Sequence, residues 1–101
     1  MKKTKLQTHA SDIVDAMDLM ELCRFCRVEQ GWIVELVDHG VLDPDGPEQS
    51  DWRFYGYNIV RARKAGRLRR DLGINAAGIG MILDLMNERD RLIRQIAMHQ
   101  Q

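Results

Sequence analysis

Residues 18–40 read DLMELCRFCRVEQGWIVELVDHG. Asp18 precedes Glu21 by three residues, the spacing of a capping box in which each side chain bonds the other residue's backbone N–H. A short helix is therefore predicted to follow Asp18 as its N-cap. A second helix is predicted to start near Glu29, with Gly40 as its left-handed stop. Two short helices joined by a tight turn form a helix-turn-helix pattern.

The second helix carries its own packing signals. Val28 and Ile33 have the spacing of a hydrophobic staple around its start. Ile33, Leu36 and Val37 follow at i, i+3 and i+4, so they are predicted to form the apolar stripe that faces the core.

A loop with an aromatic segment follows. Both prolines lie in residues 43–47 (DPDGP), which must therefore form a loop or turn. Residues 51–55 (DWRFY) are rich in aromatics and long enough for one short strand. Together, residues 42–55 predict a small β-hairpin, or wing.

Two further helices are expected. Residues 58–72 predict a helix with an arginine-rich face, and Gly73 is placed to end it. Asn75 is the predicted N-cap of a fourth helix, which runs from residue 76 toward Met98 without a breaker.

The fourth helix has a second period. Steps of three and four residues, the a/d spacing of a coiled coil, join Ile82, Leu85, Arg89, Leu92, Ile96 and His99. The pattern predicts a homodimer held by this helix. An ordinary amphipathic helix lying on its own domain is the alternative.

The 101 residues, 45% of them hydrophobic, are enough for one small domain. The predicted fold class is mainly α. Its parts are a flexible N-terminal segment over residues 1–10, a winged helix-turn-helix domain over 11–75 and a C-terminal dimerisation helix over 76–101.

The formal net charge of zero hides an asymmetry along the chain. Residues 1–52 carry five basic and eleven acidic side chains, a net of −6; residues 53–101 carry ten and four, a net of +6. A uniformly basic chain would suggest nucleic acid. This polarised one indicates a charged protein partner or electrostatically guided self-association.

Signals for catalysis, metals and membranes are weak. Cys23 and Cys26 form a lone C-x-x-C, and the three histidines do not have the spacing of a zinc finger. We therefore interpret the two cysteines as packing residues rather than as zinc ligands. We expect no catalytic residue, cofactor or metal. No apolar run reaches the length of a bilayer span, and a cytoplasmic protein with reduced thiols is expected.

Two features allow two interpretations each. The basic run of residues 61–70 could follow nucleic-acid phosphates, but a solvated face, or one that pairs with acidic groups, is favoured. Leu68 and Leu72 are expected to face inward.

Trp32 either packs in the core or, lying off the main apolar stripe beside acidic residues, forms an exposed interface anchor.

These elements resemble the winged-helix regulators of the MerR superfamily over about residues 19–86. The matching positions are Val28, Ile33, residues 40–42 (GVL) with Pro44, residues 52–55 (WRFY) and residues 72–75 (LGIN). The sequence is more closely similar to the chaperone-modulator (CbpM-like) branch. The signs are residues 37–44 (VDHGVLDP), 52–54 (WRF), 67–72 (RLRRDL) and 82–86 (ILDLM), with Leu92 and Ile96.

The resemblance implies a non-enzymatic adaptor. Members of that branch bind the J-domain of a curved-DNA-binding, DnaJ-like co-chaperone, block its work with the DnaK-type chaperone and its DNA binding, and associate as dimers. In the DNA-binding branch, the second helix presents an Arg-Tyr pair to the DNA. Val34 and Glu35 occupy those positions here, and a carboxylate would repel phosphate. Direct DNA binding is therefore not expected, although Arg53 and Tyr55 are retained as in a DNA-binding wing.

An acidic surface is the predicted docking site for the basic helix of a J-domain. Its candidate residues are Glu29, Glu35, Asp38, Asp43 and Asp45, with Trp32 as the central apolar anchor. Complementary charge would speed association, and aromatic burial would hold the complex. A MerR-type DNA-binding transcriptional regulator, based on Arg53 and the basic third helix, is the competing prediction.

Overall fold

The computed structural model describes residues 5–6 and 14–100. Its elements are β1 (Lys5–Leu6), β2 (Val14–Asp15), α1 (Leu19–Cys26), α2 (Gln30–Asp38), the short 3-10 helix η2 (Gln49–Asp51), α3 (Gly56–Leu72) and α4 (Ala76–His99). The fold is mainly helical, as expected. The flexible segment predicted for residues 1–10 lies outside the described residues except at β1, which pairs antiparallel with β2. This strand pairing was not predicted from the sequence.

The capping box at the start of α1 is confirmed. Asp18 Oδ1 accepts a 2.8 Å hydrogen bond from the Glu21 amide, and the Asp18 amide donates a 2.9 Å bond to Glu21 Oε1. Two N–H groups that the first turn of a helix leaves without partners are thus satisfied by side chains three residues apart. The start of α1 is therefore determined locally.

The predicted stop of α2 is also confirmed. Gly40 has a φ of +73°, which glycine adopts without the steric cost that a Cβ brings. The Gly40 amide bonds the Val37 carbonyl at 3.1 Å, and the Val41 amide bonds the Leu36 carbonyl at 2.8 Å. This paired arrangement caps the last carbonyls of α2 and sends the chain back toward the core. With α1 packed on α2, the helix-turn-helix prediction is correct.

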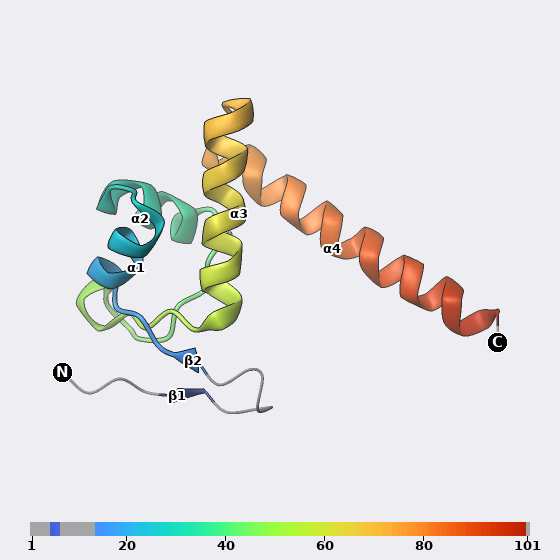
Figure 1. Cartoon of the computed structure of the whole chain (residues 1–101), viewed down its shortest axis with the longest axis horizontal. Coiled ribbons are helices and arrows are strands. Elements are labelled where there is room, and N and C mark those ends of the chain that lie inside the picture. The colour runs from blue at the N-terminus through green and yellow to red at the C-terminus, as the bar shows by residue number, and fades with distance from the viewer. Residues whose placement is uncertain (1–4, 7–13, 101) are drawn as a thin grey trace.

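A single core lies among the four helices and the chain segments between them. Helix α1 packs on α2 and α3, and α4 packs on α2 and α3 through its first turns (Figure 1). The largest fully buried side chains come from α1, α2, α4 and the segments between helices: Leu22, Ile33, Leu36, Val41, Leu42, Phe54 and Ile79. Helix α3 adds the buried side chains of Ile59, Ala62 and Ala65. Val28 packs against this cluster and Ile33 belongs to it, as a hydrophobic staple requires.

The predicted β-hairpin wing is wrong. Only one isolated antiparallel bridge, between Asp45 and Arg53, joins the two sides of the 42–55 segment, and η2 occupies its far end. Phe54 instead pairs with Met17, in a separate bridge that ties the segment to the chain before α1. Two prolines, which donate no backbone N–H, flank Asp45 within two residues and prevent a continuous ladder on that side.

The ends of α3 and α4 follow the predicted signals. Gly73 caps α3 with a φ of +67°, and the Asn75 side chain accepts a bond from the Gly78 amide at the start of α4. Helix α3 begins at Gly56, two residues before the predicted start. Leu68 is half-buried, but Leu72 is 68% exposed, so the expectation that it faces inward is wrong.

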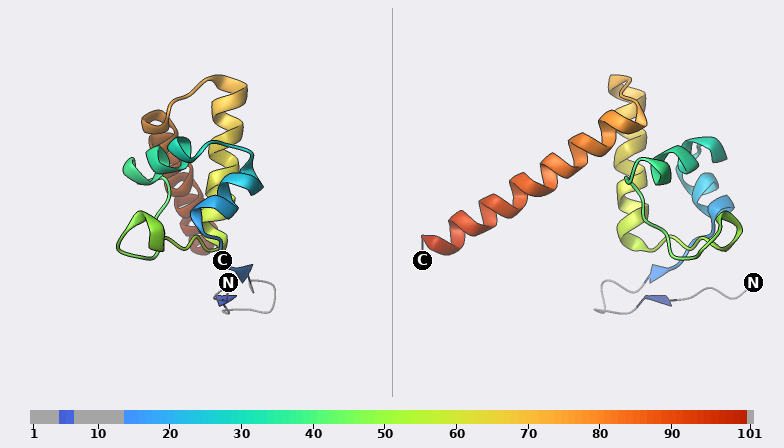
Figure 2. Two further views of the ribbon diagram at one scale, coloured as in Figure 1. Left: turned by 90° about the vertical axis from the view of Figure 1, so that its left-hand side faces the viewer. Right: turned by 180° about the vertical axis from the view of Figure 1, so that it is seen from behind.

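Helix α4 leaves the body of the protein after its first turns. Figures 1 and 2 show its second half projecting away from the other helices, and from Asp84 onward all of its residues are exposed. Its 24 residues correspond to a rod of about 36 Å. The alternative prediction, in which this helix lies along its own domain, therefore applies only to its first turns.

Candidate partner-binding surface

Exposed carboxylates lie on α2 and on the segment that follows it. Glu35 and Asp38 are exposed on α2, and Asp43 and Asp45 are exposed on the 42–55 segment. Within the described part of the chain, no ion pair neutralises these four side chains. Part of the predicted acidic surface thus consists of solvent-exposed carboxylates that form no ion pair with the described residues.

Asn58, a buried residue of α3, holds the backbone beneath this charge. Its Oδ1 accepts a 2.8 Å hydrogen bond from the Asp43 amide, and its Nδ2 donates a 3.2 Å bond to the Asp43 carbonyl. One carboxamide therefore satisfies both backbone groups of Asp43. The backbone that carries the exposed Asp43 side chain is therefore held to α3.

Asp45 is fixed by a different contact. Its amide and carbonyl exchange hydrogen bonds of 3.0 and 2.8 Å with the carbonyl and amide of Arg53. The guanidinium of Arg53 donates a 2.9 Å bond to the carbonyl of Trp52, so part of its donor capacity is used within the protein. Tyr55, the other residue of the alternative DNA-binding pair, is half-buried at the N-cap of α3.

Arg61 is a buried structural residue whose burial was not predicted from the sequence. It was expected to lie on a solvated basic face, but it is 6% exposed. Its Nε donates a 2.7 Å hydrogen bond to the Val41 carbonyl, and its Nη2 lies 3.7 Å from Asp84 of α4. Arg61 lies three residues, nearly one helical turn, after Asn58 on the same inward face of α3. That spacing was the available signal.

The exposed-anchor interpretation of Trp32 is wrong. Its side chain is 4% exposed, and the guanidinium carbon of Arg69 lies 4.1 Å from its ring centroid. The same guanidinium lies 3.5 Å from Glu29. Among the described residues, Glu29 is thus the one predicted docking carboxylate with an ion-pair partner. The pKa of Glu29 is lowered by a hydrogen bond from its own backbone amide and then by Arg69. Arg69 thus joins α3 to the start of α2.

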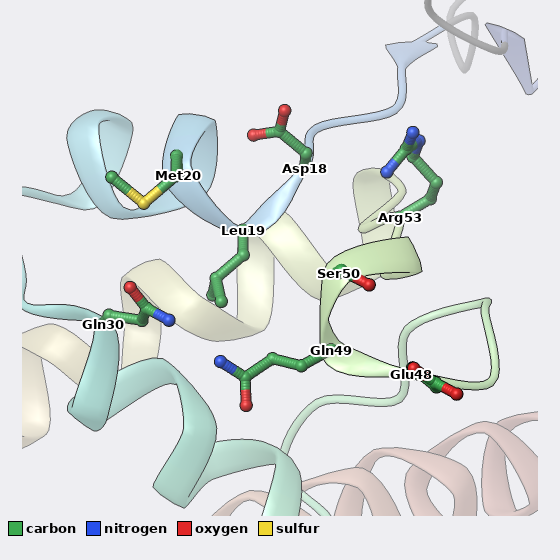
Figure 3. Close-up of a pocket in the computed structure, with 8 residues that line it drawn as sticks. All are labelled: Asp18, Leu19, Met20, Gln30, Glu48, Gln49, Ser50 and Arg53. Atoms are coloured by element: carbon green, nitrogen blue, oxygen red, sulfur yellow. The ribbon is translucent and has the colours of Figure 1, made fainter.

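A cavity of about 550 Å³ lies where α1, α2 and η2 begin. It is lined by Asp18, Leu19, Met20, Gln30, Glu48, Gln49, Ser50 and Arg53. Figure 3 shows the carboxamides of Gln30 and Gln49 extending toward each other across it. With two carboxylates and one guanidinium among its lining residues, the cavity has a weak net negative charge, so it favours basic groups over anions.

The cysteines have the properties of packing residues. Burial raises the pKa of both the Cys23 and the Cys26 thiol, which opposes formation of the reactive thiolate. Among the described residues, no group of three or more His, Cys, Asp or Glu side chains could hold a metal ion. The described part of the chain contains no candidate membrane-spanning helix.

The predicted dimerisation stripe is exposed along the free part of α4. Leu85, Leu92 and Ile96 are 63%, 44% and 57% exposed, and Arg89 lies among them. Ile82, at the start of the stripe, is half-buried where α4 still contacts the body. The apolar side chains from Leu85 onward therefore have no cover within the described chain.

Comparison with known proteins agrees with this architecture. Residues 17–101 match the family described as MerR HTH family regulatory protein. The chaperone modulatory protein CbpM of Pseudomonas entomophila is 27% identical over 92 residues, 91% of each chain. The protein of the same name from Coxiella burnetii (strain Dugway 5J108-111) is 32% identical over 76 residues, 75% of this chain and 72% of its own. The chain belongs to the MerR helix-turn-helix regulatory proteins and to the chaperone modulatory protein CbpM family.

Proposed function

We propose that this protein is a cytoplasmic, non-enzymatic modulator that inhibits a DnaJ-like co-chaperone by binding its J-domain. The observation that carries the proposal is the set of unpaired carboxylates on α2 and the 42–55 segment, in a chain whose relatives are named chaperone modulatory proteins. A basic helix of a J-domain complements such a surface in charge. Occupying that helix would exclude the DnaK-type chaperone and requires no catalytic group.

The supports beneath the surface favour a defined docking geometry. Asn58 and Arg53 fix the backbone of Asp43 and Asp45, while Glu35 and Asp38 lie on a capped helix. Groups held in place lose less conformational entropy on binding, which favours affinity. Glu29 also belongs to the proposed surface, where it forms an ion pair with Arg69. The buried side chain of Trp32 packs beneath α2.

The test is a Glu35→Lys plus Asp38→Lys variant, titrated with the J-domain of a DnaJ-like co-chaperone at physiological ionic strength. Reversing two charges should weaken binding by at least about tenfold. A Glu88→Lys plus Asp90→Lys variant, which makes the same charge change on α4, should bind as the unchanged protein does. Equal affinity in all three proteins would contradict the proposed docking surface. Absence of binding by the unchanged protein would contradict the J-domain as the partner.

The homodimer is part of the proposal and rests on α4. A helix that projects from its domain with an apolar stripe gains stability when a second copy covers that stripe, since most helical stability in proteins comes from packing of an apolar face. The stripe residues from Leu85 to Ile96 supply that face. Two copies joined there would present two acidic surfaces to partners.

Analytical ultracentrifugation tests the dimer. A Leu92→Glu plus Ile96→Glu variant should sediment as a monomer, because charged side chains cannot be buried in the seam without partners. Met98 is 73% exposed and lies about 140° around the helix from the stripe, so Met98→Glu is the control and should leave the dimer intact. A monomeric unchanged protein would contradict this part of the proposal.

DNA binding is the second candidate function, favoured by the match to MerR-type regulatory proteins over residues 17–101. It predicts duplex affinity that falls steeply with salt concentration, because Arg53 and the α3 arginines would displace counterions. The free carboxylates of Glu35 and Asp38 on α2 oppose it. A fluorescence titration with duplex DNA across a salt series decides between the two functions, since the adaptor predicts no duplex affinity.

A further inference from the structure

A cavity of about 250 Å³ lies between the end of α1 and the middle of α3, away from the acidic residues described above. Its chemically distinctive lining residues are Phe25, Cys26, Arg27, Arg63, Arg67 and Arg70. The three α3 arginines follow at i, i+4 and i+7, which places them on one helix face. Four arginines, one at the end of α1 and three on α3, therefore line one small cavity.

The charge in this arginine cavity is largely uncompensated. No carboxylate is among the residues that line it. Arg70 pairs with its chain neighbour Asp71 at 3.2 Å, and the Arg63 guanidinium carbon lies 5.6 Å from the Phe25 ring centroid. Arg27 and Arg67 form no ion pair within the described part of the chain. Like charges held together destabilise one another, and a bound anion would relieve that repulsion.

Two residues that line the cavity, Arg27 and Gly66, are each unfavourable for local helix stability. Arg27 caps α1 with a φ of +59°, a left-handed conformation that favours glycine. Gly66 lies in the interior of α3, where glycine weakens a helix, and it lines the cavity. A Cβ at Gly66 would meet nothing within 4 Å, so packing within the protein does not require a glycine there.

We propose that the arginine cavity binds a short acidic segment of a partner protein. Carboxylates of the segment accept hydrogen bonds from the forked guanidiniums, an arrangement in which arginine is stronger than lysine. An apolar side chain of the same segment packs on Phe25, which is 49% exposed. The protein then carries two docking sites of opposite charge, and this second site does not depend on the J-domain proposal.

A protein segment fits this site better than nucleic acid. The basic side chains are balanced by an equal number of carboxylates elsewhere in the chain, so long-range attraction of a polyanion is weaker than for a uniformly basic protein. The arginine cavity is also confined, whereas a nucleic-acid strand needs a row of basic contacts along its backbone. A short acidic segment can place its few charges within the cavity and end there.

Fluorescence anisotropy with the full chain tests the site. The probe is a fluorescein-labelled peptide in which glutamate alternates with leucine, compared with a glutamine-for-glutamate version and with a labelled single-stranded oligonucleotide. The glutamate peptide should bind at least about tenfold more tightly than the glutamine peptide at physiological ionic strength. Binding of the oligonucleotide in preference to the glutamate peptide would overturn the proposal, as would absence of peptide binding.

Two variants locate the binding. Arg67→Glu reverses one charge of the cavity, and Gly66→Leu fills the cavity without changing any charge. Each should weaken peptide binding by about tenfold or more, while Arg94→Glu, the same charge change on the exposed end of α4, should alter it by less than about twofold. Leucine forms helix better than glycine, so circular dichroism of Gly66→Leu should show an intact fold. Peptide binding that survives in both cavity variants would overturn the assignment.

Discussion

The Nε atom of Arg61 donates a 2.7 Å hydrogen bond to the carbonyl oxygen of Val41 in the buried interior. Replacing Arg61 with Met keeps an apolar stem but removes this donor and the 3.7 Å ion pair with Asp84. We expect Arg61→Met to lower the free energy of unfolding by about 1–3 kcal/mol, the cost of leaving a buried polar group without its partner. Urea denaturation measures the change. Arg63→Met, at an exposed position of the same helix, should change it by less than about 0.5 kcal/mol.

Asn58→Ala tests whether the buried carboxamide positions the acidic surface. The variant loses both hydrogen bonds to the Asp43 backbone and should be less stable by about 1–3 kcal/mol. It should also bind the J-domain more weakly although no charge has changed, because Asp43 is no longer held in place. Asn87→Ala on the exposed part of α4 is the matched control. A destabilised Asn58→Ala protein that binds with unchanged affinity would show that the position of Asp43 is unimportant.

The lowered pKa of Glu29 predicts a direction for acid stability. A carboxyl whose pKa is lower in the folded state stabilises the fold above its unfolded-state pKa and loses that contribution as the pH falls through the folded-state value. The stability difference between the unchanged protein and Glu29→Gln should therefore shrink in acid. Urea titrations at a series of acidic pH values measure it, and a difference that grows as the pH falls would contradict the assignment.

Arg69→Met separates the two causes of that pKa shift. In an NMR titration, the pKa of Glu29 should rise in this variant but stay below its ordinary value. The reason is that the larger cause, the hydrogen bond from the backbone amide of Glu29 itself, remains. An unchanged pKa would mean that the 3.5 Å pair with Arg69 contributes nothing.

The thiols of Cys23 and Cys26 should react slowly in the folded protein. Burial raises both pKa values, so a smaller fraction is thiolate at neutral pH than in an ordinary cysteine. Iodoacetamide labelling followed by mass spectrometry should be slower than for glutathione, and it should accelerate in urea. Rapid labelling of the native protein would instead indicate an activated thiol.

Features that depend on residues within about one helical turn could be predicted from the sequence. The capping box of Asp18 and Glu21, the stops at Gly40 and Gly73 and the cap at Asn75 all lie where expected. Each is decided by backbone groups and side chains a few positions apart, so distant segments have little influence. The positions of the acidic side chains on α2 followed from the same local signals.

The burial of individual side chains could not be predicted in this way. Arg61 and Trp32 were both expected to be exposed in at least one interpretation, yet both are buried because they face segments far away in the chain. Arg61 contacts a carbonyl 20 residues earlier, and the ion pair of Arg69 with Glu29 spans 40 residues. Periodicity identifies a helix face, but it does not say which segment covers that face.

What the sequence by itself determined is the order and the ends of the helices, together with the separation of negative and positive charge along the chain. The tertiary structure alone decided that residues 42–55 form no hairpin. Arg53 and Phe54 are neighbours, but their backbones pair with Asp45 and Met17, on opposite sides of the segment. It also decided that four arginines line one cavity with Phe25. Both outcomes depend on how α3 packs against α1 and the loop, and packing is set by the whole core rather than by neighbours in the chain.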